Sequence, residues 1–268
     1  MPKAKVSDIE MYYEVAGEGP PLLMSSGWSL AGRNFGKSHP ILSRKYTCIR
    51  HDHRGMGRTD APDGPWTIAQ MADDLAGLLD HLKIDRTRMI GGGGMGARVA
   101  MELAIRHPDR ISVLELGSAV LKSDHFSASL ARMWKRLRAL DPELWAEEVT
   151  LWCYTPATYI ERPEIPEAAF RGRAGEDTFP APHSYDRIVD AMLALDLRGR
   201  ARNIKCPTLI TCGGVEDLFT GPRYARAVHE EIPNSVLKIF EGASHGYTGE
   251  CHDEYMALIL DWFEKHGD

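Results

Sequence analysis

The feature that most constrains the fold is the alternation of short apolar runs with longer segments of helical periodicity. The apolar runs are PLLMSSG from residue 21, YTCIRHD from 46, RTRMIGG from 86, ISVLELGS from 111, PTLITCGG from 207 and SVLKIFEG from 235. Between two of these runs, apolar side chains recur at helical spacing behind the expected N-cap Thr67: Ile68, Met71, Leu75, Leu78, Leu79 and Leu82. Strands that alternate with helices require crossover connections, so we predict an α/β fold with a mostly parallel central sheet and helices on both faces.

Composition and charge exclude several classes of protein. With 268 residues, 43% of them hydrophobic, the chain can bury one substantial core. Its net charge of −6 argues against nucleic-acid binding, and its first residues contain no apolar run long enough for a signal peptide or a membrane span. The five cysteines lack C-x-x-C spacing, which favours reduced thiols over disulfides or a zinc site. We therefore expect a cytoplasmic protein without a metal site. We also expect, on other grounds given below, a small-molecule ligand and no cofactor, and we leave a homodimer open.

Candidate functional residues follow the strands at the points where the strands end. Ligand sites in parallel sheets lie beyond the carboxyl ends of the strands. At these points the chain places Ser26, a run of four glycines at 91–94, Ser118, Asp217 and His245. An acidic residue after one strand and a histidine after the next strand is the arrangement by which a carboxylate orients an imidazole base.

In this order the motifs resemble those of the α/β-hydrolase superfamily, in the branch of single-domain enzymes with a helical cap. The resemblance rests on the D-x-R-G-x-G motif at 52–57, the glycine-rich turn at 92–96, the PTL sequence at 207–209, Asp217 and His245. It covers nearly the whole chain outside the cap. Each motif alone is weak evidence, but together they are strong. We expect the D-x-R-G-x-G motif to be a structural, charged turn near the site.

The resemblance also implies how the chain is divided. The α/β-hydrolase core would comprise residues 1–120 and 201–268, and a helical cap would be inserted as residues 121–200. This middle section is rich in Trp, Tyr, Arg and Pro and has helical stretches between two core strands. Because a lid of this kind shapes the pocket and excludes water, we expect the substrate pocket to lie beneath it.

The catalytic roles that the resemblance implies are only partly filled. The nucleophile position of the G-x-S-x-G elbow falls on Gly94, which has no side chain. The acid falls on Asp217 and the base falls on His245. Less favoured candidates are Glu216 for the acid, and His229 and His252 for the base. Because glycine adopts the strained backbone of such a turn without steric penalty, the resemblance implies a relaxed elbow without its nucleophile.

Further site residues follow from the same resemblance. The oxyanion hole would be formed by the backbone N–H groups of Trp28 and Met95, and Met95 begins a helix whose dipole favours negative charge. Ser26 stands where the family usually has a histidine, which makes the pocket more polar and roomier. Ser26 and Ser118 are therefore candidate substrate-binding residues. A phosphate-binding glycine loop is disfavoured, because the run does not fit G-x-x-x-x-G-K-[ST].

Three functional hypotheses remain open. The leading hypothesis is a hydrolase of a small ester, lactone, amide or activated C–C bond, whose nucleophile either was replaced naturally by Gly94 or was removed so that a ligand could be trapped. The second is a non-catalytic relative that keeps the pocket and binds a small molecule. The third is a lyase, isomerase or cofactor-free oxygenase in which His245 and Asp217 abstract a proton.

Overall fold

The computed structural model describes residues 2–175, 178–214, 217 and 220–267. Over these residues the chain forms an eight-stranded sheet in the order β1-β2-β4-β3-β5-β6-β7-β8. The strands are β1 (Lys3–Val6), β2 (Ile9–Ala16), β3 (Pro21–Ser25), β4 (Thr47–His51), β5 (Thr87–Gly91), β6 (Ile111–Gly117), β7 (Thr208–Gly213) and β8 (Ser235–Phe240). β2 pairs antiparallel with β1 and with β4, and every pair from β4 across to β8 is parallel. The prediction of a mostly parallel sheet is confirmed.

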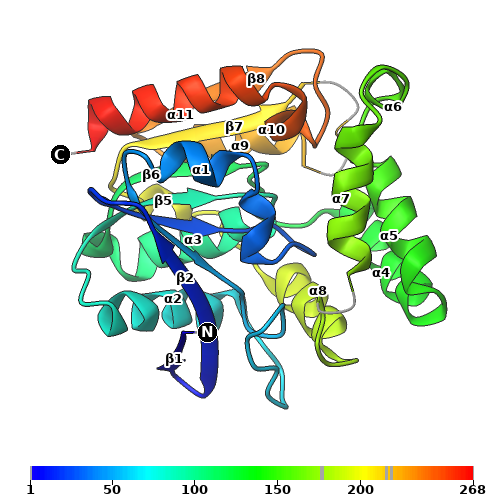
Figure 1. Cartoon of the computed structure of the whole chain (residues 1–268), viewed down its shortest axis with the longest axis horizontal. Coiled ribbons are helices and arrows are strands. Elements are labelled where there is room, and N and C mark those ends of the chain that lie inside the picture. The colour runs from blue at the N-terminus through cyan, green and yellow to red at the C-terminus, as the bar shows by residue number, and fades with distance from the viewer. Residues whose placement is uncertain (1, 176–177, 215–216, 218–219, 268) are drawn as a thin grey trace.

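Helices cover both faces of this sheet, as predicted (Figure 1). The helices of the core are α1 (Ser38–Leu42), α2 (Ile68–His81), α3 (Met95–Arg106), α9 (Pro222–Glu231), α10 (Tyr247–Glu250) and α11 (His252–His266), with 3-10 turns η1 (Gly32–Phe35), η2 (Pro108–Arg110) and η3 (Ala201–Asn203). Successive residues of β3 enter two separate buried clusters: Leu22 and Met24 pack with α1 and α11, and Leu23 packs with α2 and α3. The strands read as continuous apolar runs because both of their faces are buried.

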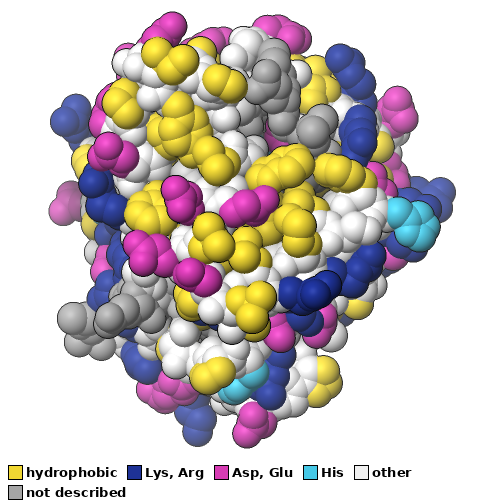
Figure 2. Space-filling model, turned by 90° about the vertical axis from the view of Figure 1, so that its right-hand side faces the viewer, with side chains coloured by type: hydrophobic (Ala, Val, Ile, Leu, Met, Phe, Trp, Pro, Cys, Tyr) yellow, Lys and Arg dark blue, Asp and Glu magenta, His cyan; other side chains and the backbone are white. Residues whose placement is uncertain are grey.

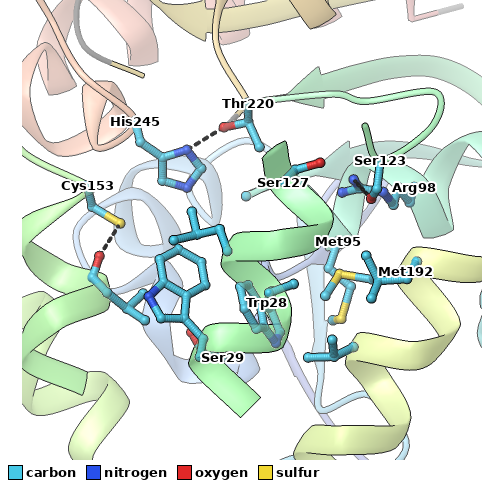
Figure 3. Close-up of a pocket in the computed structure, with 18 of the residues that line it drawn as sticks. Trp28, Ser29, Met95, Arg98, Ser123, Ser127, Cys153, Met192, Thr220 and His245 are labelled. Carbon is cyan, nitrogen blue, oxygen red and sulfur yellow. Dashed lines mark hydrogen bonds between the residues drawn. The ribbon is translucent and has the colours of Figure 1, made fainter. Parts of the chain in front are cut away.

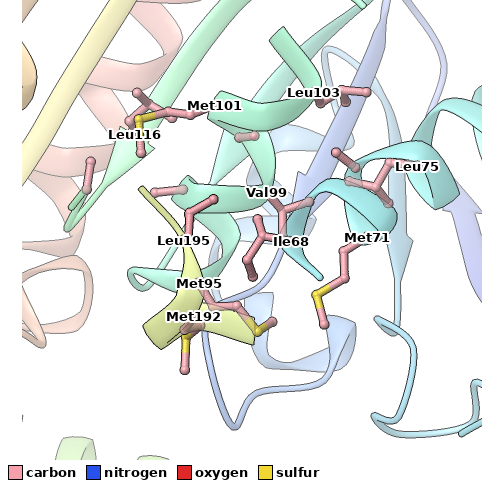
Figure 4. Close-up of a cluster of buried hydrophobic side chains, with 14 of the residues drawn as sticks. Ile68, Met71, Leu75, Met95, Val99, Met101, Leu103, Leu116, Met192 and Leu195 are labelled. Carbon is pink, nitrogen blue, oxygen red and sulfur yellow. The ribbon is translucent and has the colours of Figure 1, made fainter. Parts of the chain in front are cut away.

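The amphipathic segment that follows β4 forms α2, as its spacing predicts. Thr67 is the N-cap, and its side chain accepts a hydrogen bond from the Gln70 N–H at 3.0 Å. Met71 and Leu75 of α2 pack towards α3 in one buried cluster (Figure 4). Leu82 lies just past the end of the helix and is half-buried, so the predicted helical face extends one residue too far.

The strand order reverses around β3, and this reversal positions the site. From β3 the chain passes to β4 on one side, whereas β5 lies on the other side of β3. The loops that follow β3 and β5 therefore leave the sheet next to each other, and the Gly92 N–H donates to the Ser25 carbonyl at 2.9 Å between them. In open parallel sheets ligands bind at such a reversal point.

A helical cap region is inserted between β6 and β7. Its helices are α4 (His125–Leu140), α5 (Pro142–Leu151), α6 (Pro156–Glu161), α7 (Glu164–Ala174) and α8 (Ser184–Ala194). The two ends of the insertion lie side by side, because the Leu197 N–H donates to the Leu121 carbonyl at 3.0 Å and Lys122 forms an ion pair with Asp196 at 2.9 Å. The cap stands beyond the carboxyl ends of the strands, on the right-hand side of Figure 1. The residues proposed as the boundaries between core and cap stay a prediction.

The D-x-R-G-x-G motif forms a buried charged turn. The Arg54 side chain is fully buried and bonds both carboxylate oxygens of Asp74, at 2.6 and 2.7 Å, and Asp8 at 3.0 Å. The Asp52 carboxylate accepts from the backbone N–H groups of Gly32, at 2.8 Å, and Arg58, at 3.0 Å. The motif thus ties together the loops after β3 and β4, which fits the structural role expected for it.

The face that carries the cap exposes several large apolar side chains (Figure 2). Those of the cap helices are Phe126, Met133, Leu140, Leu144, Leu151 and Ile160.

Among the described helices, none is long and apolar enough to cross a bilayer. The five cysteines all lie in described segments and are free thiols. Within the same segments no three potential ligand side chains gather into a metal site.

Candidate active site

Gly94 lies in a tight turn between β5 and α3. Its backbone angles are φ +71° and ψ −59°, and the Met95 N–H donates to the Gly93 carbonyl at 2.8 Å, which closes a three-residue turn. This geometry is strained for a residue that bears a side chain. The Gly94 N–H donates to the Gly117 carbonyl at 3.2 Å and ties the turn to the end of β6. The chain therefore builds a tight strand-to-helix turn, and glycine at its centre adopts these angles without steric penalty.

A Cβ atom at position 94 would fit without a steric clash. A Cβ atom placed on Gly94 would lie 3.5 Å from Arg98 Nη1 and from Thr220 Cγ2, which is ordinary van der Waals contact. A Cβ atom on Gly96 would instead lie 2.5 Å from the Ser25 carbonyl oxygen. Glycine is thus required at position 96 by the close approach of α3 to the end of β3. At position 94 the available space does not require it.

Asp217, Thr220 and His245 form a hydrogen-bonded chain near this turn. Thr220 Oγ1 lies 2.8 Å from Asp217 Oδ2 and 2.6 Å from His245 Nδ1 (Figure 3), and Asp217 Oδ2 lies 3.2 Å from the same nitrogen. Because an ionised carboxylate can only accept, the Thr220 hydroxyl donates to Asp217 and accepts from the Nδ1–H of His245. The lone pair of the imidazole then lies on Nε2, where it can act as a general base.

The Asp217 carboxylate holds its charge although it is buried. Burial alone would raise its pKa, but the charge of His245 and the hydrogen bonds from His245 and Thr220 outweigh burial and lower the pKa below its usual range. Asp217 is therefore ionised at neutral pH. Its charge stabilises the imidazolium that forms when His245 takes up a proton.

A cavity lies between the core and the cap, next to the turn. It has about 70 Å³ of free space, and its lining includes Trp28 and Gly94 from the core and Trp134 and Met192 from the cap helices. His245 also lines it, and Figure 3 shows the ring edge opposite Thr220 turned towards the residues of this cavity. His245, the glycine turn and the cap thus meet at one apolar-walled space, as expected for a pocket beneath a lid.

A second cavity adjoins the first and contains the two predicted substrate-binding serines. It has about 160 Å³ of free space and is lined by Ser26 and Ser118, and it shares His245 and Gly93 with the first cavity. The Ser26 hydroxyl donates to the Leu30 carbonyl at 2.5 Å, so in this structure it stabilises the loop after β3. Ser118 has a φ of +55°, a strained value held by the end of β6.

The predicted oxyanion donors converge on one acceptor. The Met95 N–H donates to the Gly93 carbonyl at 2.8 Å, and the Trp28 N–H donates to the same oxygen at 3.4 Å. The longer bond is weak, because hydrogen bonds of this type are strongest near 2.9 Å. An oxyanion hole likewise consists of N–H groups directed at one oxygen, and the oxyanion role of these two groups stays a prediction. A substrate oxygen would have to compete with the Gly93 carbonyl for them.

The less favoured candidates lie apart from this arrangement. Among the described histidines, the imidazole that bonds Asp217 is that of His245. His229 bonds the Ser235 hydroxyl at 2.8 Å on the surface, and His252 lies 3.5 Å from Asp253 at the start of α11. Glu216 falls outside the described residues.

Three side chains at the cavity were not singled out from the sequence. Thr220 follows Asp217 by three residues, a spacing that allows its N–H and hydroxyl to bond the carboxylate. Arg98 follows Gly94 by four residues, so one helical turn places it beside the site, and this signal could have been found. Arg173 comes from α7 of the cap and carries no such signal, because its place depends on how the cap packs.

Comparison of the sequence and the structure with known proteins finds relatives whose names describe peptidases and hydrolases. A family model described as serine aminopeptidase, S33, matches residues 39–252. The protein named "Putative carbamate hydrolase RutD" of Azorhizobium caulinodans is 27% identical over 262 residues, which is 97% of each chain. The enol-lactonase of Burkholderia xenovorans has a TM-score of 0.85 at 28% identity, covering 98% of this chain and 100% of its own. A thermophilic esterase of Thermogutta terrifontis has a TM-score of 0.85 at 27% identity, covering 96% and 94%.

Proposed function

The chain belongs to the α/β-hydrolase superfamily, in the family described as serine aminopeptidase, S33, and from this premise we propose that it hydrolyses a small ester, lactone, carbamate or amide. An activated C–C bond is a further target of the same chemistry. The names of its relatives support this range, because they include a carbamate hydrolase, an enol-lactonase and an esterase. The observation that carries the proposal is the chain of hydrogen bonds from Asp217 through Thr220 to His245, beside the cavity at Gly94.

A water molecule takes the part of the missing nucleophile in this proposal. Nε2 of His245 removes a proton from the water, whose oxygen attacks the substrate carbonyl carbon. The carbonyl electrons move onto the oxygen, which accepts from the N–H groups of Met95 and Trp28 in place of the Gly93 carbonyl. The tetrahedral intermediate then expels the alcohol or amine, which takes the proton back from His245. The cavity lined by Gly94 and His245 supports this route, because it offers space for the water beside the turn.

The test compares the natural protein with two variants on a panel of small esters, lactones and amides. His245→Ala should lower kcat/KM by about 10²–10⁴-fold, because it removes the general base. His229→Ala is the matched control, since it also removes a histidine but leaves Asp217 and Thr220 paired, and it should keep full activity. Turnover that is the same in the natural protein and in His245→Ala would contradict the proposal.

A second candidate is a binding protein that has lost hydrolysis. It is favoured by two observations: Gly94 has no side chain, and the Gly93 carbonyl accepts from both predicted oxyanion donors. Gly94→Ser separates the two candidates. If only the serine variant hydrolyses the panel, the natural protein binds its ligand without cleaving it. If the natural protein turns over substrate without an initial burst and depends on His245, the water route is supported.

A further inference from the structure

We propose that the cavity between core and cap binds a short ligand with a carboxylate at each end, one end at Arg98 and the other at Arg173. For the reaction, this means an ester or lactone that carries one free carboxylate and gains a second on hydrolysis. The statement about the reaction rests on the proposed function. The statement about binding does not, and it can be tested without turnover.

Arg98 is a buried cation that bonds no carboxylate in the described part of the chain. It lies on α3, is 6% exposed, and places Nη1 3.5 Å from the Cβ position of Gly94. Its Nη2 donates to the Ser123 hydroxyl at 3.4 Å, a long and neutral contact, and its buried Nε has no hydrogen-bond partner among the described residues. Burial lowers its pKa to about 10, against a smaller effect of Tyr224, so it is still charged at neutral pH.

Arg173, on the cap side of the cavity, is also buried and also bonds only neutral groups among the described residues. It lies on α7, is 7% exposed and lines both cavities. Its Nη1 donates to the Thr150 hydroxyl at 3.0 Å and its Nη2 to Cys153 Sγ at 3.2 Å, and both acceptors are neutral. Its buried Nε has no partner in the described part of the chain.

The chain compensates a buried arginine where no cavity is present. Arg54 is buried away from the site and bonds the carboxylates of Asp74 and Asp8. Among the described residues, Arg98 and Arg173 donate to the neutral groups of Ser123, Thr150 and Cys153. A buried charge without a partner is strongly unfavourable, and a bound anion would remove that penalty.

Two described carboxylates near the site are already engaged. Asp217 is bonded to Thr220 and His245. Glu250 accepts from the backbone N–H of Ser244 at 2.7 Å and from the Thr158 hydroxyl at 2.5 Å. Both are therefore held by groups other than the two arginines, which supports an outside source for the missing negative charge.

The two arginines occupy different sides of the cavity. Figure 3 shows Arg98 beside Ser123, on the side opposite Cys153, and Arg173 bonds Cys153. Apolar side chains of Leu130, Val149 and Met192 line the space that they share. A ligand that satisfies both cations while contacting this wall has two charged ends and a short apolar body. Because Arg98 lies beside Gly94, its end is the one where hydrolysis would release a carboxylate.

The test measures binding of succinate, glutarate and adipate, and of their monoamides and diamides, to the intact protein. Tryptophan fluorescence is the readout, because two tryptophans line the cavity. Each carboxylate should strengthen binding by between about tenfold and a hundredfold over the isosteric amide, as for a hydrogen bond to a charged group. Arg98→Met and Arg173→Met should each abolish the gain in affinity from one of the two carboxylates. Arg171→Met on α7 and Arg106→Met on α3 are exposed controls that should retain both.

Several results would overturn the proposal. Equal affinity for a diacid and its diamide in the natural protein would refute it without any variant. So would an unchanged acid preference in both Arg98→Met and Arg173→Met, or tighter binding of a phosphate ester than of every carboxylate. If a methionine variant does not fold, the corresponding Arg→Gln variant takes its place. Diacid binding by the natural protein, without hydrolysis of any substrate in the panel, supports this inference and counts against the proposed function alone.

Discussion

Alanine at position 94 should be tolerated, although the backbone there favours glycine. With φ at +71°, a residue that bears a side chain costs about 1–3 kcal/mol in strain. Alanine also reduces the entropy of the unfolded chain, which offsets about 0.4–1 kcal/mol. Because the added Cβ meets nothing closer than 3.5 Å, no packing penalty is added. We therefore expect Gly94→Ala to lower the free energy of unfolding by about 1–2 kcal/mol.

Gly93→Ala is the matched comparison, because Gly93 also has a positive φ, +58°, but lacks the space. Its Cβ would lie 2.7 Å from the Gly27 Cα atom. A backbone atom cannot turn aside as the end of a flexible side chain can, so the loop after β3 would have to shift. Overpacking of this kind adds about 1–3 kcal/mol, and Gly93→Ala should be more destabilising than Gly94→Ala by about that amount.

Urea denaturation followed by tryptophan fluorescence measures the difference directly. In thermal unfolding followed by circular dichroism, Gly94→Ala should lower Tm by roughly 2–8 °C, since each kcal/mol corresponds to about 2–4 °C in a chain near this size. If Gly94→Ala is as destabilising as Gly93→Ala, a Cβ atom does not fit at position 94 without a clash and the reasoning is wrong. The expected result also ensures that Gly94→Ser folds well enough for the activity test.

Two further predictions concern buried polar groups. Burial raises the pKa of Glu115 to about 8, against the hydrogen bonds from Thr211 and Tyr255 that lower it. The pKa of Glu115 in the folded protein lies above the ordinary 4.5, so the folded protein favours the neutral carboxyl group. The contribution of Glu115 to the free energy of unfolding is therefore complete below pH 4.5 and is lost as the pH rises to about 8. Glu115→Gln should therefore flatten the pH dependence of the unfolding free energy over this interval, and a slope equal to that of the natural protein would contradict it. Thr220→Val should lower kcat by less than the roughly 10²–10⁴-fold expected for removal of a general base, and Thr220→Ser should restore it, because the hydroxyl orients His245. Equal kcat values for the Val and Ser variants would rule this out.

The sheet was predictable because its strands are buried on both faces and follow one another with helices between them. Because ligand sites lie beyond the carboxyl ends of parallel strands, the predicted strands also indicated which residues to consider: Gly94, Asp217 and His245. The bridging role of Thr220 was not predicted, since it depends on the loop conformation after β7. Arg173 could not be found at all, because the packing of cap helices decides which of many arginines faces inward. The shared acceptor at Gly93 is also a tertiary feature, set by how closely the loop after β3 approaches the turn.

The paired ends of the cap have a consequence for how such proteins diversify. Leu121 and Leu197 are hydrogen-bonded neighbours, and Lys122 pairs with Asp196 just inside them. The two points where the insertion leaves and re-enters the core are therefore adjacent, and this does not depend on the length or helix content of the insertion. Closing that connection costs little more for a long insert than for a short one. A cap grafted from a relative at these residues should leave the sheet and the Asp217–His245 pair in place, so that the choice of ligand can be exchanged as a module while the base is inherited unchanged.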